Sequence, residues 1–240
     1  MSDIGWQLIY WDHVGEGAAW IVLTLVTYLL FRALQQRAGG NPVLNPVLLA
    51  TATIILLMTL SGRGYDDYNR GGAWLLWLLG PATVALAIPL YLNFAQVRSV
   101  LLPMFAALMA GSITAVLSAI VIGKLLGASP ETIASLAPKS VTTPIAMAIA
   151  AEIGGIPALA AVFVIFTGII GAIFGSAIFN ALGVKDPRAR GFAMGIAAHG
   201  IGTARAFQVN WQAGTFSGIA MTINGILTAL FLPLIWLLLA

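Results

Sequence analysis

Long runs of apolar residues, interrupted only by Gly, Pro and single charges, dominate this sequence of 240 residues. About 20 mostly apolar residues suffice for a helix to cross a bilayer, and 60% of this chain is hydrophobic while 8% is charged. A water-soluble domain could not bury that much apolar surface. The sequence therefore predicts an all-α polytopic membrane protein, folded as a single transmembrane domain over residues 1–240.

About eight segments separate at the Gly, Pro and charged positions. They lie near residues 17 to 35, 42 to 60, 72 to 95, 99 to 126, 131 to 152, 156 to 182, 189 to 209 and 214 to 239. We expect the first half of the domain to span 17–126 and the second half 131–239.

Composition also excludes several classes of function. The eleven Lys and Arg residues are scattered singly, so the net charge of +3 indicates loop topology and no nucleic-acid partner. There is no Cys for a disulfide or a thiolate site. With two His residues and no clustered acids, neither a metal site nor a catalytic triad can be assembled. We expect no enzyme activity and no cofactor.

Positive residues in loops favour the cytoplasmic side of a membrane. Arg32 and Arg37 follow the first segment, Arg98 follows the third, and Lys185, Arg188 and Arg190 follow the sixth. All three loops can be cytoplasmic only if one intervening segment does not cross. The stretch 130–155 is the best candidate, as a re-entrant hairpin with residues 138–144 near its tip and the N-terminus outside.

Three segments contain helix breakers. The third contains Gly80-Pro81, the fifth Pro138 and Pro144, and the seventh Gly200 and Gly202. The pairing of Asn45-Pro46 before one broken segment with Ile156-Pro157 before another suggests two halves of opposite orientation. Inverted repeats with broken helices are a recurring plan of secondary transporters.

The fifth segment contains the first candidate binding site. Lys139, Ser140, Thr142 and Thr143 precede Pro144, which suits the first turn of a helix with Thr143 as its N-cap. A helix start with a nearby lysine can bind a carboxylate or phosphate. The alternative is that Lys139 extends to a lipid headgroup.

The seventh segment contains the second candidate, at residues 198–205. Two glycines loosen the backbone before Arg205, whose planar guanidinium suits an anionic ligand, and Thr203 is a candidate cap for a second half-helix. His199 is a candidate proton carrier. The alternatives are an interfacial anchor for Arg205 and a simple interhelical hydrogen bond for His199.

Further positions are candidates for the binding site or for helix packing. Gly80-Pro81 predicts either a third helix start, with Thr83 lining the cavity, or a simple packing kink. Glu152 either pairs with Lys139, marks the path of a coupling ion, or is a solvated loop charge. Asn224 suits an interhelical hydrogen bond, and the spacing of Gly168, Gly171 and Gly175 indicates close helix packing.

The chain resembles the LrgB/CidB family of bacterial membrane proteins, which has the plastidic glycolate/glycerate transporter as a plant relative. The resemblance extends from about residue 41 to the C-terminus. It is carried by the residues at 136–147, 154–157 and 198–205, with support from 65–72 and 80–87. Ala198 and Gly200 depart from the family's usual Ser-His-Ala, and Ala148 stands where some members have an acidic residue.

The resemblance implies two functions in the bacterial cytoplasmic (inner) membrane. One is transport of a small carboxylate such as glycolate, glycerate, lactate or pyruvate, with possible coupling to protons or sodium. The other is holin-like or antiholin-like modulation of murein hydrolase activity and autolysis, with a small LrgA/CidA-type membrane partner. We prefer transport, because broken helices with Lys139, Thr142, Thr143 and Arg205 suit a carboxylate. We also expect a homodimer in the lipid bilayer.

Overall fold

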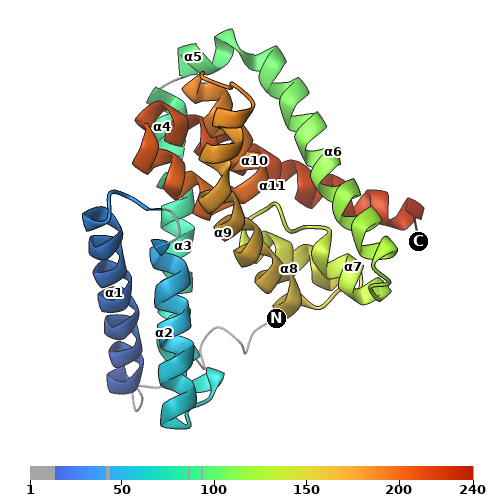
Figure 1. Ribbon diagram of the computed structural model, residues 1–240. Coiled ribbons are helices and arrows are strands. Elements are labelled where there is room, and N and C mark those ends of the chain that lie inside the picture. Colours follow the sequence, from blue (N-terminus) through green and yellow to red (C-terminus); the bar gives the residue numbers. More distant parts are fainter. Residues whose placement is uncertain (1–13, 42–43, 86, 93, 240) are drawn as a thin grey trace. The chain divides into compact units, whose positions relative to one another are not determined.

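The computed structural model describes residues 14–41, 44–85, 87–92 and 94–239, and Figure 1 shows the helices in sequence order. The helices are α1 (Val14–Arg37), α2 (Pro46–Ser61), α3 (Tyr65–Ala85), α4 (Ala87–Leu92), α5 (Phe94–Ser99), α6 (Leu101–Leu125), α7 (Pro130–Leu136), α8 (Thr143–Glu152), α9 (Pro157–Ala181), α10 (Pro187–Val209) and α11 (Trp211–Leu239). No strand occurs within these ranges. The all-α prediction is confirmed.

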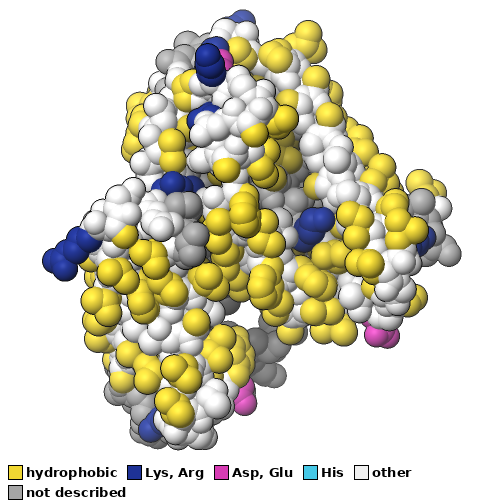
Figure 2. All heavy atoms as spheres, in the orientation of Figure 1, with side chains coloured by type: hydrophobic (Ala, Val, Ile, Leu, Met, Phe, Trp, Pro, Cys, Tyr) yellow, Lys and Arg dark blue, Asp and Glu magenta, His cyan; other side chains and the backbone are white. Residues whose placement is uncertain are grey.

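Four of the described helices are long and apolar enough to cross a membrane, namely α1, α6, α9 and α11. Their large apolar side chains are widely exposed, as the yellow surface in Figure 2 shows. Exposed apolar surface on this scale requires lipid around it. The chain is therefore a polytopic membrane protein, as predicted.

Internal contacts divide the chain into two compact units, Met1–Ala85 and Leu86–Ala240. This boundary precedes α6, whereas the sequence suggested halves meeting after residue 126. α6 packs against α7, α10 and α11 of the C-terminal unit, and the side chain of Ser112 bonds it to α11. Each unit is described by itself below.

The N-terminal unit contains α1, α2 and α3. Asn45 caps α2 by accepting hydrogen bonds from the N–H groups of Val47 and Leu48, at 2.9 and 3.2 Å. The backbones of α1 and α3 meet at Gly17 and Gly71, where a Cβ on Gly71 would overlap the carbonyl oxygen of Gly17. Helices approach this closely only over residues without side chains.

Gly71→Val is expected to separate α1 from α3 and lower the stability of this unit by about 1–3 kcal/mol, the usual cost of overpacking. The measurement is the melting temperature of purified protein in detergent. Gly64→Ala is the matched control, because a Cβ there meets nothing within 4 Å. Equal melting temperatures for the two variants would show that the contact between α1 and α3 does not limit stability.

α3 corrects one sequence prediction. It continues through Pro81 to Ala85, so no helix begins at Gly80-Pro81 and the predicted break there is wrong. A proline in the interior of a long helix is tolerated where the freed backbone groups find other partners. The proposed first-half counterpart of the broken seventh segment is therefore not formed by α3.

In the C-terminal unit, α7 and α8 form a short hairpin between the long helices α6 and α9. At seven and ten residues, these helices are about 10 and 15 Å long, well short of the roughly 30 Å hydrocarbon core. After α8 the chain returns to α7, where the N–H of Ile156 donates to Ser135 Oγ at 2.7 Å. The chain after α8 thus packs against the last turn of α7 before α9 begins.

Ser135→Ala should release the chain after α8 from the end of α7. The Ser135 hydroxyl is buried, donates to the carbonyl of Glu131 and accepts from Ile156 N, so its loss strands a backbone N–H at a cost of about 1–3 kcal/mol. Thermal unfolding in detergent measures the effect. Ser118→Ala is the control, because Ser118 Oγ bonds only within its own helix, to Ala115 O. A Ser135→Ala variant as stable as that control would contradict this account.

α10 is a second hairpin. The chain reverses at His199, whose backbone angles are φ 40° and ψ −133°. In a straight helix Met194 and Gly202 would be about 12 Å apart, but a Cβ on Gly202 would lie 2.9 Å from Met194 Cγ. The first arm, 187–198, places Gly191 beside Ala213 of α11, whereas the second arm, 200–209, returns toward the start of α11 with Phe207 beside Gly214.

The predicted break in this segment is confirmed, but its cause is corrected. We expected Gly200 and Gly202 to open the backbone, whereas the positive φ falls on His199. Gly202 is small because the two arms meet there, where a Cβ would lie 2.5 Å from Ala198 Cβ. Gly200 is exposed and has open space around it.

The glycines of α9 pack against the first arm of α10, as predicted. A Cβ on Gly168 would lie 2.7 Å from His199 Cε1, one on Gly171 would overlap Ala198 Cβ, and one on Gly175 would lie 2.5 Å from Met194 Cε. These contacts run in opposite order along the two helices. They fix the depth of the α10 tip near the middle of α9.

Candidate functional site

The tips of the two hairpins meet at Asn224, near the middle of α11. The Asn224 side chain is fully buried, and its Nδ2 donates to the carbonyl oxygens of Ser140 and Ile196, at 3.3 and 3.4 Å. Ser140 belongs to the α7–α8 turn, and Ile196 lies in the last turn before the reversal of α10. Two breaks in regular helix, 56 residues apart in the chain, are thus joined at one side chain.

The α8 start lies at this junction. Thr142 is the N-cap, with Thr143 and Pro144 in the first turn, so the predicted cap at Thr143 is displaced by one residue. The side chain of Thr142 makes no capping hydrogen bond, which leaves first-turn N–H groups without a side-chain acceptor. The next residue, Ile145, faces Gly225 of α11, where a Cβ would lie 3.0 Å from Ile145 Cδ1.

Ser140 and Lys139 precede this helix start. Ser140 is 2% exposed, and its Oγ has no hydrogen-bond partner among the described residues. Lys139 is half-buried, and none of the described carboxylates forms an ion pair with it. A buried hydroxyl without a partner and a cation without a counter-ion require a ligand or water to satisfy them.

The α10 tip is held to α9 by His199. Its imidazole is 3% exposed, and Nε2 lies 2.8 Å from the carbonyl oxygen of Val164. A residue other than glycine at φ 40° costs about 1–3 kcal/mol, and such strain collects at functional sites. The interhelical hydrogen bond expected for His199 is present.

Thr203 lies in the first turn after the tip rather than at a cap. Its Oγ1 donates to the carbonyl of His199 at 2.8 Å and lies 2.8 Å from Ser217 Oγ in α11. The predicted capping role is therefore wrong, because Thr203 lies inside the second arm and its hydroxyl bonds back to the carbonyl of His199. Thr203 instead holds the second arm to α11.

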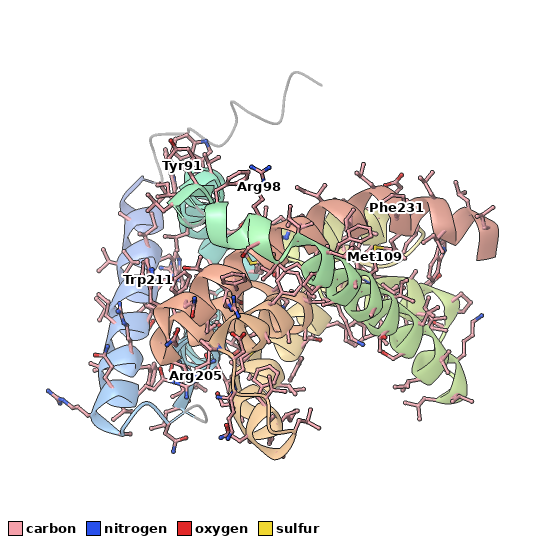
Figure 3. All side chains as sticks on the ribbon, turned by 90° about the horizontal axis from the view of Figure 1, so that it is seen from above. Tyr91, Arg98, Met109, Arg205, Trp211 and Phe231 are labelled. Carbon is pink, nitrogen blue, oxygen red and sulfur yellow. The ribbon has the colours of Figure 1, made fainter. Side chains whose placement is uncertain are left out.

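Arg205 lies on the second arm, about 9 Å along the helix from the tip. Its Nη1 donates to Gln208 Oε1 at 3.2 Å, and its Nε is buried without a partner. Figure 3 labels Arg205 on α10 and Trp211 at the beginning of α11. Because Gln208 lies further from the tip, the guanidinium is drawn away from Ser140 and Lys139, and this structure does not bring the two predicted cations together.

Glu152 ends α8, at the opposite end of this helix from the junction. It is exposed and makes no ion pair with Lys139 in the described part of the chain, so the predicted pair is not formed. Its reading as a solvated charge agrees with this position. Thr83 lies in α3, in the other compact unit, and its role stays a prediction.

One ionised pair at the base of the α10 hairpin lies outside the spanning segments. Asp186 caps α10 by accepting from the N–H of Arg188 at 2.8 Å, and Arg188 Nη2 bonds its carboxylate at 2.7 Å. The side-chain hydrogen bond from Arg188 holds the pKa of the Asp186 carboxyl below its ordinary value. These bonds fix the start of α10.

Sequence reasoning missed two of the residues that assemble the junction. Ser112 Oγ of α6 donates to Asn224 Oδ1 at 2.5 Å, and Ser217 supports Thr203 from α11. A serine in a spanning helix is too common a residue to single out. Asn224 could have pointed to Ser112, because an Asn within an apolar helix needs polar partners on other helices.

Comparison with known proteins gives a consistent result. Residues 24–238 match the model of the LrgB-like family. A holin-like protein CidB of Staphylococcus epidermidis is 34% identical over 91% of this chain and 95% of that protein. The holin-like protein CidB of Staphylococcus aureus is 33% identical over 95% and 98%, respectively.

A third relative carries no functional name. The uncharacterized protein YwbG of Bacillus subtilis is 37% identical over 90% of this chain and 96% of that protein. No solved structure gives a significant match.

Proposed function

The chain belongs to the LrgB-like family, and on that premise we propose that it transports small carboxylates across the bacterial cytoplasmic membrane. Glycolate, glycerate, pyruvate and lactate are the proposed substrates. The proposal also includes a second copy of the chain as partner in the bilayer. The observation that carries it is the meeting of two hairpin tips beside an uncapped helix start.

The α8 start supplies the chemistry for an anion. Free N–H groups and the positive end of the helix dipole favour a carboxylate there, and Thr142 and Thr143 add hydroxyl groups at the same turn. The Ser140 hydroxyl, which has no partner among the described residues, lies two residues before Thr142. Lys139 adds a full positive charge, which gives a carboxylate a charge-assisted hydrogen bond.

The α10 hairpin supplies the opposing side. Thr203 positions its tip through the bonds to His199 and Ser217. Arg205 then serves as a second anion contact along the arm, between the tip and the membrane surface. In this arrangement Arg205 raises the local concentration of the substrate, whereas Lys139 holds the substrate at the junction.

His199 is the stronger of the two coupling candidates. It is buried at the tip and bonded to Val164 O, so a change in its protonation would alter how the tip is held to α9. Glu152, at the exposed end of α8, is the weaker candidate for the path of a coupling ion. A proton gradient is accordingly expected to change the uptake rate.

The test is uptake of radiolabelled glycolate, pyruvate and lactate by liposomes containing the purified protein, with and without a pH gradient. Saturable uptake that unlabelled carboxylates compete for is the expected result. Liposomes without protein give the background. Absence of uptake for every acid, with correctly inserted protein, would reject the proposal.

Holin-like activity is the second candidate, because two of the relatives that match nearly the whole chain are named holin-like. It predicts release of a trapped dye such as calcein, which is far larger than the acids, and a requirement for a small LrgA/CidA-type partner. The same liposomes distinguish the two functions. Dye release without saturable uptake favours the holin-like function and modulation of autolysis.

A further inference from the structure

We propose that Asn224 is a positioning residue that fixes the two hairpin tips against each other, so that the α8 start and the α10 reversal form one site. This inference rests on the proposed function for its consequence, but its structural part can be tested without transport. The sequence predicted an interhelical hydrogen bond for Asn224 but not that it joins the two hairpin tips. The names of the relatives do not assign this role either.

The bonding of the Asn224 amide is divided between two tasks. Its NH₂ group donates to both tips, at Ser140 O and Ile196 O, while its oxygen accepts from Ser112 Oγ. The amide oxygen therefore has its partner in α6, and the NH₂ group has its partners in the two tips. Both tips thus depend on one group of one side chain.

The Asn224 amide and both of its carbonyl partners lie in residues that are buried from water. Asn224, Ser140 and Ile196 are 0%, 2% and 5% exposed, so water cannot readily replace a lost hydrogen bond. Without the NH₂ group, two carbonyl oxygens would each lose this buried hydrogen bond, which favours separation of the tips. Ser140, whose hydroxyl is already unpaired, would become accessible first.

The natural absence of Cys allows a direct measurement. Ser140→Cys places a single thiol at the junction, and its reaction rate with a small maleimide is measured on the full chain in liposomes. Adding Asn224→Leu is expected to raise this rate on the order of tenfold, because two buried hydrogen bonds no longer hold the tips. Asn224→Ala is the second variant, in case leucine prevents folding.

Two controls separate positioning from general stability. Ala160→Cys places the thiol at a fully buried position near the start of α9, and its rate should not change with Asn224→Leu. Ser112→Ala removes only the bond to the amide oxygen and should leave the rate at position 140 within about twofold.

Three results would overturn the inference. They are an unchanged rate at position 140, an equal rise at positions 140 and 160, and a rise with Ser112→Ala as large as with Asn224→Leu. Protection of the thiol at position 140 by glycolate, pyruvate or lactate tests the substrate site separately. Lack of protection with a clear effect of Asn224→Leu would reject the carboxylate site and retain the positioning role.

Discussion

Lys139→Ala is expected to lower carboxylate uptake by about ten- to a hundredfold, because a hydrogen bond to a charged group contributes about 1.5–3 kcal/mol. The loss should appear mainly as a higher KM, since the lysine charge binds the substrate before any rearrangement. Lys139→Arg keeps the charge but changes its shape, so partial uptake should remain. The measurement is saturable uptake by liposomes with equal amounts of inserted protein.

Lys124→Ala is the matched control for this charge. Lys124 is exposed in the last turn of α6, so its removal changes the net charge equally without touching the junction. Uptake by this variant should equal that of the unchanged protein. If Lys139→Ala also retained full uptake, Lys139 would be an interfacial anchor, the alternative that the sequence left open.

Gly195→Leu is expected to prevent the first arm of α10 from packing on α11. A Cβ at Gly195 would overlap the backbone carbonyl oxygen of Ser217, and backbone cannot move aside as a side chain can. The cost is at least about 3 kcal/mol, the upper end of the usual range for overpacking. The readouts are the melting temperature in detergent and the fraction of monodisperse protein.

Gly200→Ala is the control in the same hairpin. A Cβ there would meet only Met221 Sδ, at 3.9 Å, and Gly200 does not have a positive φ. The variant should fold normally, and alanine favours the second arm as a helix. A Gly195→Leu protein as stable as Gly200→Ala would show that the two helices are not packed as described.

The main features of the fold were accessible from sequence because they depend on hydrophobicity and breakers. Runs of apolar residues predicted the spanning helices, and the positive loops predicted a segment that does not cross. The reversal at His199 was accessible only as a region, because two glycines lie beside it and local rules place breaks on glycine. Packing of His199 over Gly168 moved the break to its neighbour.

The site was predictable in its parts but not in its arrangement. Lys139, Ser140 and the helix start at Pro144 follow from local spacing. Their meeting with the α10 tip depends on Asn224, 84 residues beyond Ser140, and no local rule joins positions so distant. The direction of Arg205 was also inaccessible, because the competing bond to Gln208 is a matter of side-chain geometry.

The dependence of both tips on α11 sets an order for biosynthesis. α6 and α9 are apolar enough to enter the bilayer as they leave the ribosome, whereas the α7–α8 hairpin is too short to insert by itself. Ser112 must then wait for 112 residues of further synthesis before Asn224 reaches it. A nascent chain halted before α11 would have its spanning helices in place and its hairpins unsecured, which is the state that membrane chaperones and proteases are expected to recognise.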